Sequence, residues 1–95
     1  MAMDREATLA LLRTQHTFPG AFEFRVVVRP DVRVAALSAM VAAAGEAAHL
    51  VEVDERKSRQ GNYLALHVTL HLPDAERVLD VYDVLRGVQG ILTTM

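Results

Sequence analysis

One segment, Gly61–Leu72, alternates more regularly than any other part of this 95-residue chain. Its even positions from 64 onward are all apolar, whereas its odd positions carry mostly polar, small or aromatic side chains: Leu64, Leu66, Val68, Leu70 and Leu72 against Tyr63, Ala65, His67, Thr69 and His71. A period of two residues is typical of a β-strand with one buried and one exposed face. Because no other segment alternates as cleanly, we expect this strand to lie in the centre of a sheet.

Three more segments are expected to be strands of the same sheet. They are Phe22–Arg29, His49 to about Lys57, and Ile91–Met95. The first also alternates, and it places four apolar residues on one side, namely Phe22, Phe24, Val26 and Val28. The second becomes highly charged toward its end, as is typical of a strand at the edge of a sheet. The last has no charged side chain and no proline to protect an exposed edge.

Apolar residues at helical spacing predict two helices between these strands, each introduced by a Pro-Asp pair. The first is expected from Val32 to about Ala44, with Asp31 as its N-cap and a buried face of Val34, Leu37, Met40, Val41 and Ala44. The second is expected from Pro73-Asp74 to about Arg86, with a buried face of Val78, Val81, Tyr82 and Leu85. A short helix that is capped by Asp4 is expected to reach about Thr14.

The two Pro-Asp pairs mark a weak internal repeat, in which a strand is followed by a helix and then by a glycine. Two such halves describe a ferredoxin-like βαββαβ domain of the α+β class. Parallel crossovers are right-handed, so both helices fall on one face of a four-stranded antiparallel sheet with the strand order 4-1-3-2. We therefore expect a helical extension over residues 1–17 and a single domain over residues 18–95, with the opposite sheet face uncovered.

Composition excludes several classes of protein and site. The chain has no cysteine, so it has no disulfide, thiolate metal site or cysteine nucleophile. Its formal net charge of -2 gives no bulk attraction to nucleic acid or to an anionic membrane. No apolar run approaches the roughly 20 residues that a membrane-spanning helix needs. The acidic residues near the N-terminus are unlike the basic start of a signal peptide, so we expect a cytoplasmic protein.

Motifs that would indicate catalysis or metal binding are missing from the sequence. The chain has no nucleophile elbow, no phosphate-binding loop and no His-Glu-x-x-His motif. His67 and His71 share a strand face, but they stand about 13 Å apart along the strand, which is too far for one ion with ligand distances of about 2.0–2.1 Å. We therefore expect no enzymatic activity and no cofactor, and we interpret both histidines as solvated side chains.

Several residues resemble the YbeD-like family, a group of small bacterial proteins of unknown function. They are Phe18-Pro19 ahead of the strand at Phe22, the pattern Ser58-x-x-Gly61-x-Tyr63 ahead of an alternating strand, and the helix 75–85 with Tyr82 and Leu85. The resemblance spans about Phe18 to the C-terminus and implies an ACT-like ferredoxin-type fold without catalytic activity, similar to regulatory domains of amino-acid enzymes. The chain departs from the family pattern at Lys57, Arg59 and His67, and it has an extension before Phe18.

The fold and this resemblance favour a non-enzymatic regulatory or protein-interaction module that senses a small molecule or acts as a homodimer. Candidate residues for a ligand or partner lie on the uncovered sheet face, namely Arg25, Arg29, Tyr63 and His67. The basic hairpin residues Lys57 and Arg59 can bind an anion or an acidic partner. The unprotected last strand is the expected dimer edge, through Ile91, Leu92 and Thr94.

An RNA-binding sheet is the alternative, because open four-stranded sheets also serve as platforms for RNA. Such platforms place aromatic side chains on both central strands. Here Phe22 and Phe24 are expected on the buried side, and only Tyr63 on the open side. We therefore expect a homodimer with a protein or small-molecule partner, and we consider nucleic acid the less favoured partner.

Overall fold

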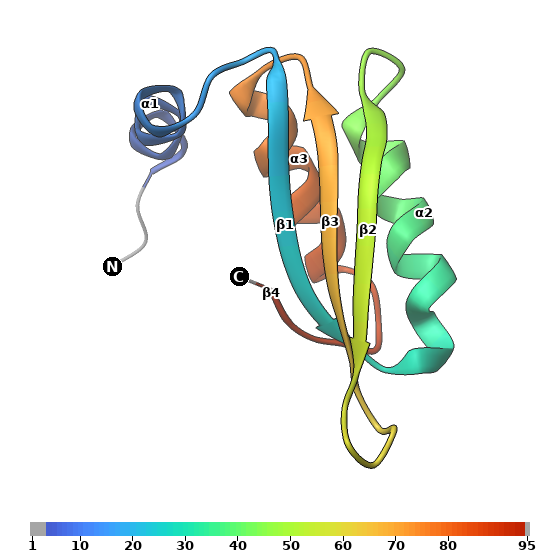
Figure 1. The fold of residues 1–95 in the computed structure, drawn as a ribbon. Helices are drawn as coiled ribbons and strands as arrows, with labels where there is room; N and C mark the ends of the chain where they lie inside the picture. The colour runs from blue at the N-terminus through green and yellow to red at the C-terminus, as the bar shows by residue number, and fades with distance from the viewer. Residues whose placement is uncertain (1–3, 95) are drawn as a thin grey trace.

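The strand β3 (Leu64–Leu72) lies inside a four-stranded antiparallel sheet, as its alternation predicts. The computed structural model describes residues 4–94 (Figure 1). β3 pairs with β1 (Gly20–Val28) on one side and with β2 (His49–Lys57) on the other. The short strand β4 (Ile91–Thr94) pairs with the other side of β1, which makes the order β2-β3-β1-β4. The predicted α+β ferredoxin-like fold and its strand order are confirmed.

The helices α2 (Arg33–Ala44) and α3 (Ala75–Arg86) pack together on one face of the sheet (Figure 1). The even-numbered residues of β1 and β3 point toward these helices and form the core, with Phe24, Val26, Val28, Leu66, Val68 and Leu72 at most 1% exposed. Their main partners on the helices are Met40, Val78, Val81 and Leu85. Burial of apolar surface at about 25 cal/mol per Å² drives this packing, and it leaves the opposite sheet face uncovered.

The two Pro-Asp pairs begin their helices differently. Asp74 caps α3 as expected, because its Oδ1 accepts a hydrogen bond of 3.1 Å from the backbone amide of Arg77. The expectation that Asp31 caps α2 is wrong. Residues Pro30–Val32 form a 3-10 turn, α2 has no side-chain cap, and the Asp31 carboxylate instead pairs with Arg29 at 3.3 Å.

The buried face of α2 also differs from the prediction. Ala36, Met40 and Ala44 are buried, as expected for the last two, but Val34 and Val41 are 68% and 44% exposed. Nearly every position of this helix is apolar, so the sequence pattern does not show which side packs on the sheet. The small alanine side chains allow one face to approach α3 and the sheet closely, and this leaves two valines outside.

The N-terminal helix α1 (Arg5–Gln15) begins at the expected cap, where Asp4 Oδ1 accepts a hydrogen bond of 2.8 Å from the Ala7 amide. It packs beside α3 and buries Leu9, which is 4% exposed. The side chain of Arg13 crosses to α3 and forms an ion pair of 3.0 Å with Glu76. None of the helices within residues 4–94 combines the length and the apolar character that crossing a membrane requires.

The hairpin between β2 and β3 is longer than expected, because β3 begins at Leu64 and not at Gly61. Ser58 closes this loop twice. Its amide donates to the Tyr63 carbonyl at 2.9 Å, and its hydroxyl accepts from the Tyr63 amide at 3.0 Å. Gly61 adopts a φ of +78°, which favours glycine. Tyr63 therefore lies in the hairpin and not within the strand, whereas Met95 of the predicted last strand lies outside the described residues.

Candidate functional site

The uncovered face of the sheet carries the odd-numbered residues of β1 and β3. Strand register places Arg25 opposite His67 and Val27 opposite Ala65. On the other side of β3, Arg56 of β2 lies opposite Ala65. Ala65 is the smallest of these side chains and stands between two larger ones, so we expect the face to be hollowed at this point.

Three adjoining cavities follow β3 to the tip of the β2–β3 hairpin, and we call them together the hairpin groove. Their volumes are about 400, 210 and 240 Å³. The first two share Arg56 and Ala65, and the last two share Ser58 and Tyr63. The middle cavity is lined by Val27, Arg56, Lys57, Ser58, Tyr63 and Ala65. It therefore combines apolar side chains with two cations and has no acidic residue in its lining.

The groove contains the basic side chains that have no carboxylate partner within the part of the chain that the structure describes. Within residues 4–94, each of the other basic residues forms an ion pair: Arg5, Arg13, Arg25, Arg29, Arg33, Arg77 and Arg86. Arg56, Lys57 and Arg59 form none, although acidic residues outnumber basic ones in the chain. All three are exposed and lie in the hairpin or at its base. Cations of this kind can make charge-assisted hydrogen bonds to an anion without first breaking an ion pair.

Of the residues predicted from the sequence, Lys57 and Tyr63 line the middle cavity, and Arg59 lines the cavity at the hairpin tip. His67 lines the cavity at the other end of the groove. The structure therefore brings four of the predicted residues into one groove. The signal that identified them was the basic hairpin together with the alternation of β3.

Arg25 lies next to the groove, but its charge is already engaged by Glu23. Its Nε donates a hydrogen bond of 2.8 Å to Glu23 Oε1, and His67 Nδ1 lies 3.7 Å from the same oxygen. The hydrogen bond from Arg25, together with the charge of its guanidinium and the nearby His67 imidazole, holds the pKa of Glu23 below its ordinary value. Glu23 thus ties the middle of the open face into a small charge network.

Two other predicted sites lie away from the groove. Arg29 follows the end of β1, where its amide donates to the Gly90 carbonyl at 2.9 Å and its side chain pairs with Asp31. On β4, Ile91 packs partly against the core, Leu92 is 50% exposed, and Thr94 lies opposite Val26. The use of β4 as a dimer edge stays a prediction.

Two histidines stack at the far end of the open face. The rings of His49 and His71 lie 4.7 Å apart at an angle of 8°, and His71 Nδ1 is buried without a hydrogen-bond partner. The interpretation of His71 as a solvated side chain therefore holds only in part, because the residue is half-buried and its Nδ1 is shielded from solvent. A bulge in β2 between Leu50 and Glu52 shifts the register so that His49 faces His71, and no sequence pattern shows such a shift.

Within residues 4–94, no three His, Asp or Glu side chains are grouped so that they could hold a metal ion.

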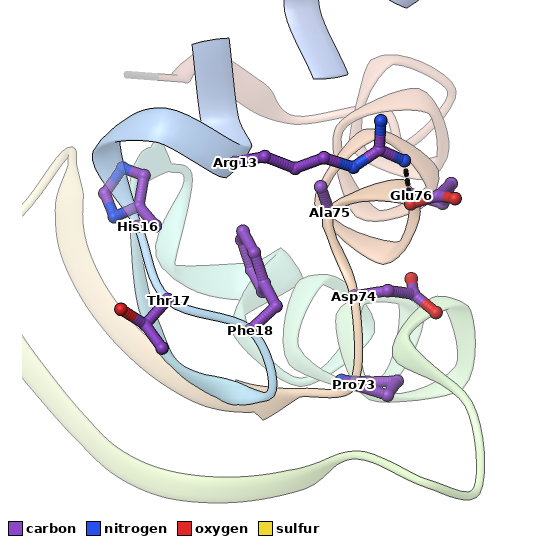
Figure 2. Close-up of a pocket in the computed structure, with 8 residues that line it drawn as sticks. All are labelled: Arg13, His16, Thr17, Phe18, Pro73, Asp74, Ala75 and Glu76. Carbon is purple, nitrogen blue, oxygen red and sulfur yellow. Dashed lines mark hydrogen bonds and ion pairs between the residues drawn. The ribbon is translucent and has the colours of Figure 1, made fainter. Parts of the chain in front are cut away.

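A larger cavity, of about 510 Å³, lies between the end of α1, the following loop and the start of α3 (Figure 2). Its lining comprises Arg13, His16, Thr17, Phe18, Pro73, Asp74, Ala75 and Glu76. Figure 2 shows that Arg13 reaches across the cavity to Glu76. The Glu76 carboxylate accepts a hydrogen bond from its own amide and another from Arg13, and these bonds lower its pKa. In this cavity Arg13 and Glu76 pair with each other and Asp74 caps α3, so the hairpin groove, whose cations have no carboxylate partner within residues 4–94, is the better candidate for binding. Sequence reasoning missed this cavity because the docking position of α1 has no local signal.

Comparisons with known proteins agree with this fold. The sequence profile described as "Protein of unknown function (DUF493)" matches residues 13–95, which include the groove and all four strands. No curated protein matches the chain. One similar solved structure is the solution structure of the C-terminal domain of the MgtC protein from Mycobacterium tuberculosis, with a TM-score of 0.69. The match covers 84% of this chain and 87% of that one at 12% identity, so it shows a shared fold.

Proposed function

We propose that this chain, which belongs to the DUF493 family of proteins of unknown function, is a non-enzymatic module that binds an anionic ligand in the hairpin groove. The resemblance to the YbeD-like family is thereby confirmed, because that family is DUF493. The fold is the ferredoxin-like type of ACT-like domains. Neither the family nor the fold indicates a ligand, so the proposal depends on the groove itself.

The observation that carries the proposal is that the unpaired cations of the described chain all lie along the groove. Acidic residues outnumber basic ones in the chain, yet Arg56, Lys57 and Arg59 have no carboxylate partner within residues 4–94. Lys57 lines the middle cavity and Arg59 the adjoining one at the hairpin tip. Both can therefore act on one ligand that spans the two cavities.

The ligand chemistry follows from the lining of the groove. Lys57 and Arg59 suit a carboxylate or a phosphate, with which arginine can form two parallel hydrogen bonds. Val27, Ala65 and the ring of Tyr63 offer apolar contact beside these charges. The first cavity, of about 400 Å³, falls within the range of about 300–1,000 Å³ for small-molecule sites. The other two, of about 210 and 240 Å³, lie below it, so a ligand of ordinary size would span adjoining cavities. We therefore expect a small anion with an apolar body, either as a free molecule or as the acidic side chain of a protein partner.

The groove is better suited to binding than to catalysis. The serine hydroxyl in its lining, that of Ser58, accepts a hydrogen bond from the Tyr63 amide and serves to close the hairpin. A nucleophilic serine needs a base within hydrogen-bond reach, and His67 lines a different cavity from Ser58. Ligand binding would instead engage Lys57 and Arg59 of the hairpin with one bound anion, and we propose this as the basis of a regulatory response.

RNA binding finds less support in the same residues. The open face of β1 and β3 carries no Phe, Tyr or Trp within the described residues, since Phe22 and Phe24 are buried on the helix side. Tyr63 alone, in the hairpin, offers a ring for stacking on a base. An RNA platform would need at least a second such ring on a central strand.

A thermal-shift screen tests the proposal with two kinds of ligand. One arm uses free amino acids, aromatic carboxylates and inorganic phosphate, and the other uses a short acidic peptide. A ligand at about 100 times its dissociation constant should add about 2.7 kcal/mol of stability. The double variant Lys57→Gln/Arg59→Gln should lose this shift, whereas the control Arg86→Gln, which removes a cation paired with Asp83 on α3, should keep it.

Each outcome of the screen either identifies the class of ligand or contradicts the proposal. A shift in the first arm alone would identify a small-molecule sensor, and a shift in the second arm alone would identify a peptide-binding module. A shift that persists in the double variant would place the ligand outside the groove and contradict the proposal. The absence of any shift in both arms would contradict it as well. Salt-sensitive binding of single-stranded RNA that requires Tyr63 would favour the RNA alternative.

A further inference from the structure

The outer face of α2 is apolar and uncovered. Its exposed residues follow each other at helical spacing along one stripe: Val34, Ala35, Ser38, Val41 and Ala42. None of them is charged, and the two valines are 68% and 44% exposed. Surface helices normally present charged or polar residues on this side. An apolar stripe of this kind indicates a surface that another molecule covers.

The stripe continues onto the neighbouring edge of the sheet. Arg33 at the start of α2 pairs with Glu55 of β2 at 2.7 Å, and Figure 1 shows the helix beside β2 at the same side of the molecule. Leu50 and Val51 at the start of β2 are 47% and 54% exposed. Together with the two valines of α2, they make up half of the large apolar side chains that are exposed within residues 4–94. We call this area the edge surface.

β2 lies at the edge of the sheet and pairs with β3 alone, so the backbone groups along its other side are available for a further strand. The charged residues of β2 also change sign along the strand, from acidic to basic. Glu52 and Asp54, which form no ion pair within the described residues, come before Arg56 and Lys57, which form none either. A strand with acids first and bases second is complementary to an antiparallel copy of itself, because the acidic part of each then faces the basic part of the other.

We propose that a second copy of this chain docks on the edge surface, with the two β2 strands antiparallel and the two α2 stripes in contact. A two-fold axis at Asp54 brings Arg56 opposite Glu52 of the second copy, and the symmetry forms this pair twice. The two Asp54 side chains then face each other, and each is flanked by the Arg56 of the other copy. The two sheets join into one, with all helices on the same side.

The helix stripe fits the same axis. Ser38 lies about 7.5 Å along α2 from Arg33 at the usual rise of 1.5 Å per residue. The same distance from Glu55 along β2 corresponds to about two residues at 3.3 Å each, which reaches Val53. The middle of the α2 stripe therefore lies within about one residue of the proposed axis at Asp54. Antiparallel packing then places Val34 of each copy near Val41 of the other, so the α2 stripe is compatible with the axis inferred from the strand.

The other edge of the sheet offers less for a second copy. β4 has four residues and pairs with β1 at three positions. It presents one large exposed apolar side chain, Leu92, where the edge surface presents four. The interface inferred here shares Asp54 and Arg56 with the lining of the hairpin groove. The groove proposal is tested at Lys57 and Arg59 and the dimer at Val34, so either proposal can fail without the other.

Sedimentation velocity of the full chain over micromolar concentrations tests the proposal. The wild-type protein should form a dimer. Val34→Glu should weaken it at least about tenfold, as is typical when a charge replaces a central apolar contact. The control Val84→Glu changes a valine on α3 that is 39% exposed, and it should have no effect. Circular dichroism would show that both variants are folded, which we expect because both side chains are exposed.

Charge variants test the register of the strands. Arg56→Glu should weaken the dimer, and the double variant Glu52→Arg/Arg56→Glu should restore it, because the pair is re-formed with its charges exchanged. Asp54→Asn should tighten the dimer, since it removes the repulsion at the axis. A protein that is monomeric at every concentration would overturn the proposal. It would also be overturned if Leu92→Lys dissociated the dimer while Val34→Glu did not, because the interface would then lie on β4.

Discussion

Replacement of Leu66 by alanine tests the assignment of the two faces of β3. Leu66 is fully buried, and it lies opposite Val26 of β1 and Glu55 of β2 on the face that the helices cover. The change removes three carbon groups from the centre of the core. At about 0.8 kcal/mol for each buried group, the transfer from water alone accounts for roughly 2.4 kcal/mol.

The cavity that remains adds to this loss, because packed neighbours relax only in part. Leucine-to-alanine changes in protein cores cost about 2–5 kcal/mol, and we expect Leu66→Ala to fall within this range. For a domain of this size, each kcal/mol corresponds to about 4–8 °C in Tm. The variant should therefore melt at least about 8 °C below the wild type.

Urea denaturation measures the effect directly, from the shift in the midpoint at a constant slope. Leu92→Ala is the matched control, since it makes the same chemical change at a side chain that is 50% exposed. We expect this control to cost less than about 1 kcal/mol, as surface changes do. If Leu66→Ala cost no more than the control, the even-numbered residues of β3 would not form the core, and the strand register would be wrong.

Two further predictions concern the charged residues. Asp74→Ala should lower the free energy of unfolding, measured in urea, by about 1 kcal/mol, because α3 loses its N-cap. Asp31→Ala should lower it clearly less, since Asp31 caps no helix. Equal losses would contradict the different starts of the two helices. The pKa of Glu23 is lowered in the folded protein. The ionised carboxylate therefore stabilises the fold above the unfolded pKa of about 4.3. This contribution is lost as the pH falls through the folded pKa. In an NMR titration of the side-chain carboxyl carbon, Arg25→Gln should move the Glu23 pKa back toward its ordinary value, and an unchanged pKa would show that Arg25 is not the cause.

The fold was predictable because its signals are local. The alternation of β3 and β1 identified the two central strands, since residues that share one face of a strand share one environment. Each Pro-Asp pair marked the start of a helical segment, although only Asp74 acts as a side-chain cap. The ferredoxin-like topology then followed from short connections and right-handed crossovers.

The prediction was weakest where local patterns are ambiguous. The sequence of α2 is apolar nearly all round, so several faces fit the core equally well, and the valines expected inside lie outside. The single-residue bulge in β2 had no signal either, although it decides that His49 stacks on His71. Both features depend on which neighbours are present in three dimensions.

The sequence by itself determined the strands, the helices and their order, because periodicity and turn residues act within a few positions of the chain. It also placed Lys57 and Arg59 in a basic hairpin. Only the tertiary structure decided which cations stay free, since Arg13 meets Glu76 and Arg33 meets Glu55 through segments that are distant in sequence. Ion pairing and burial depend on distances between such segments. For this reason the hairpin groove and the edge surface became visible only once the chain was folded.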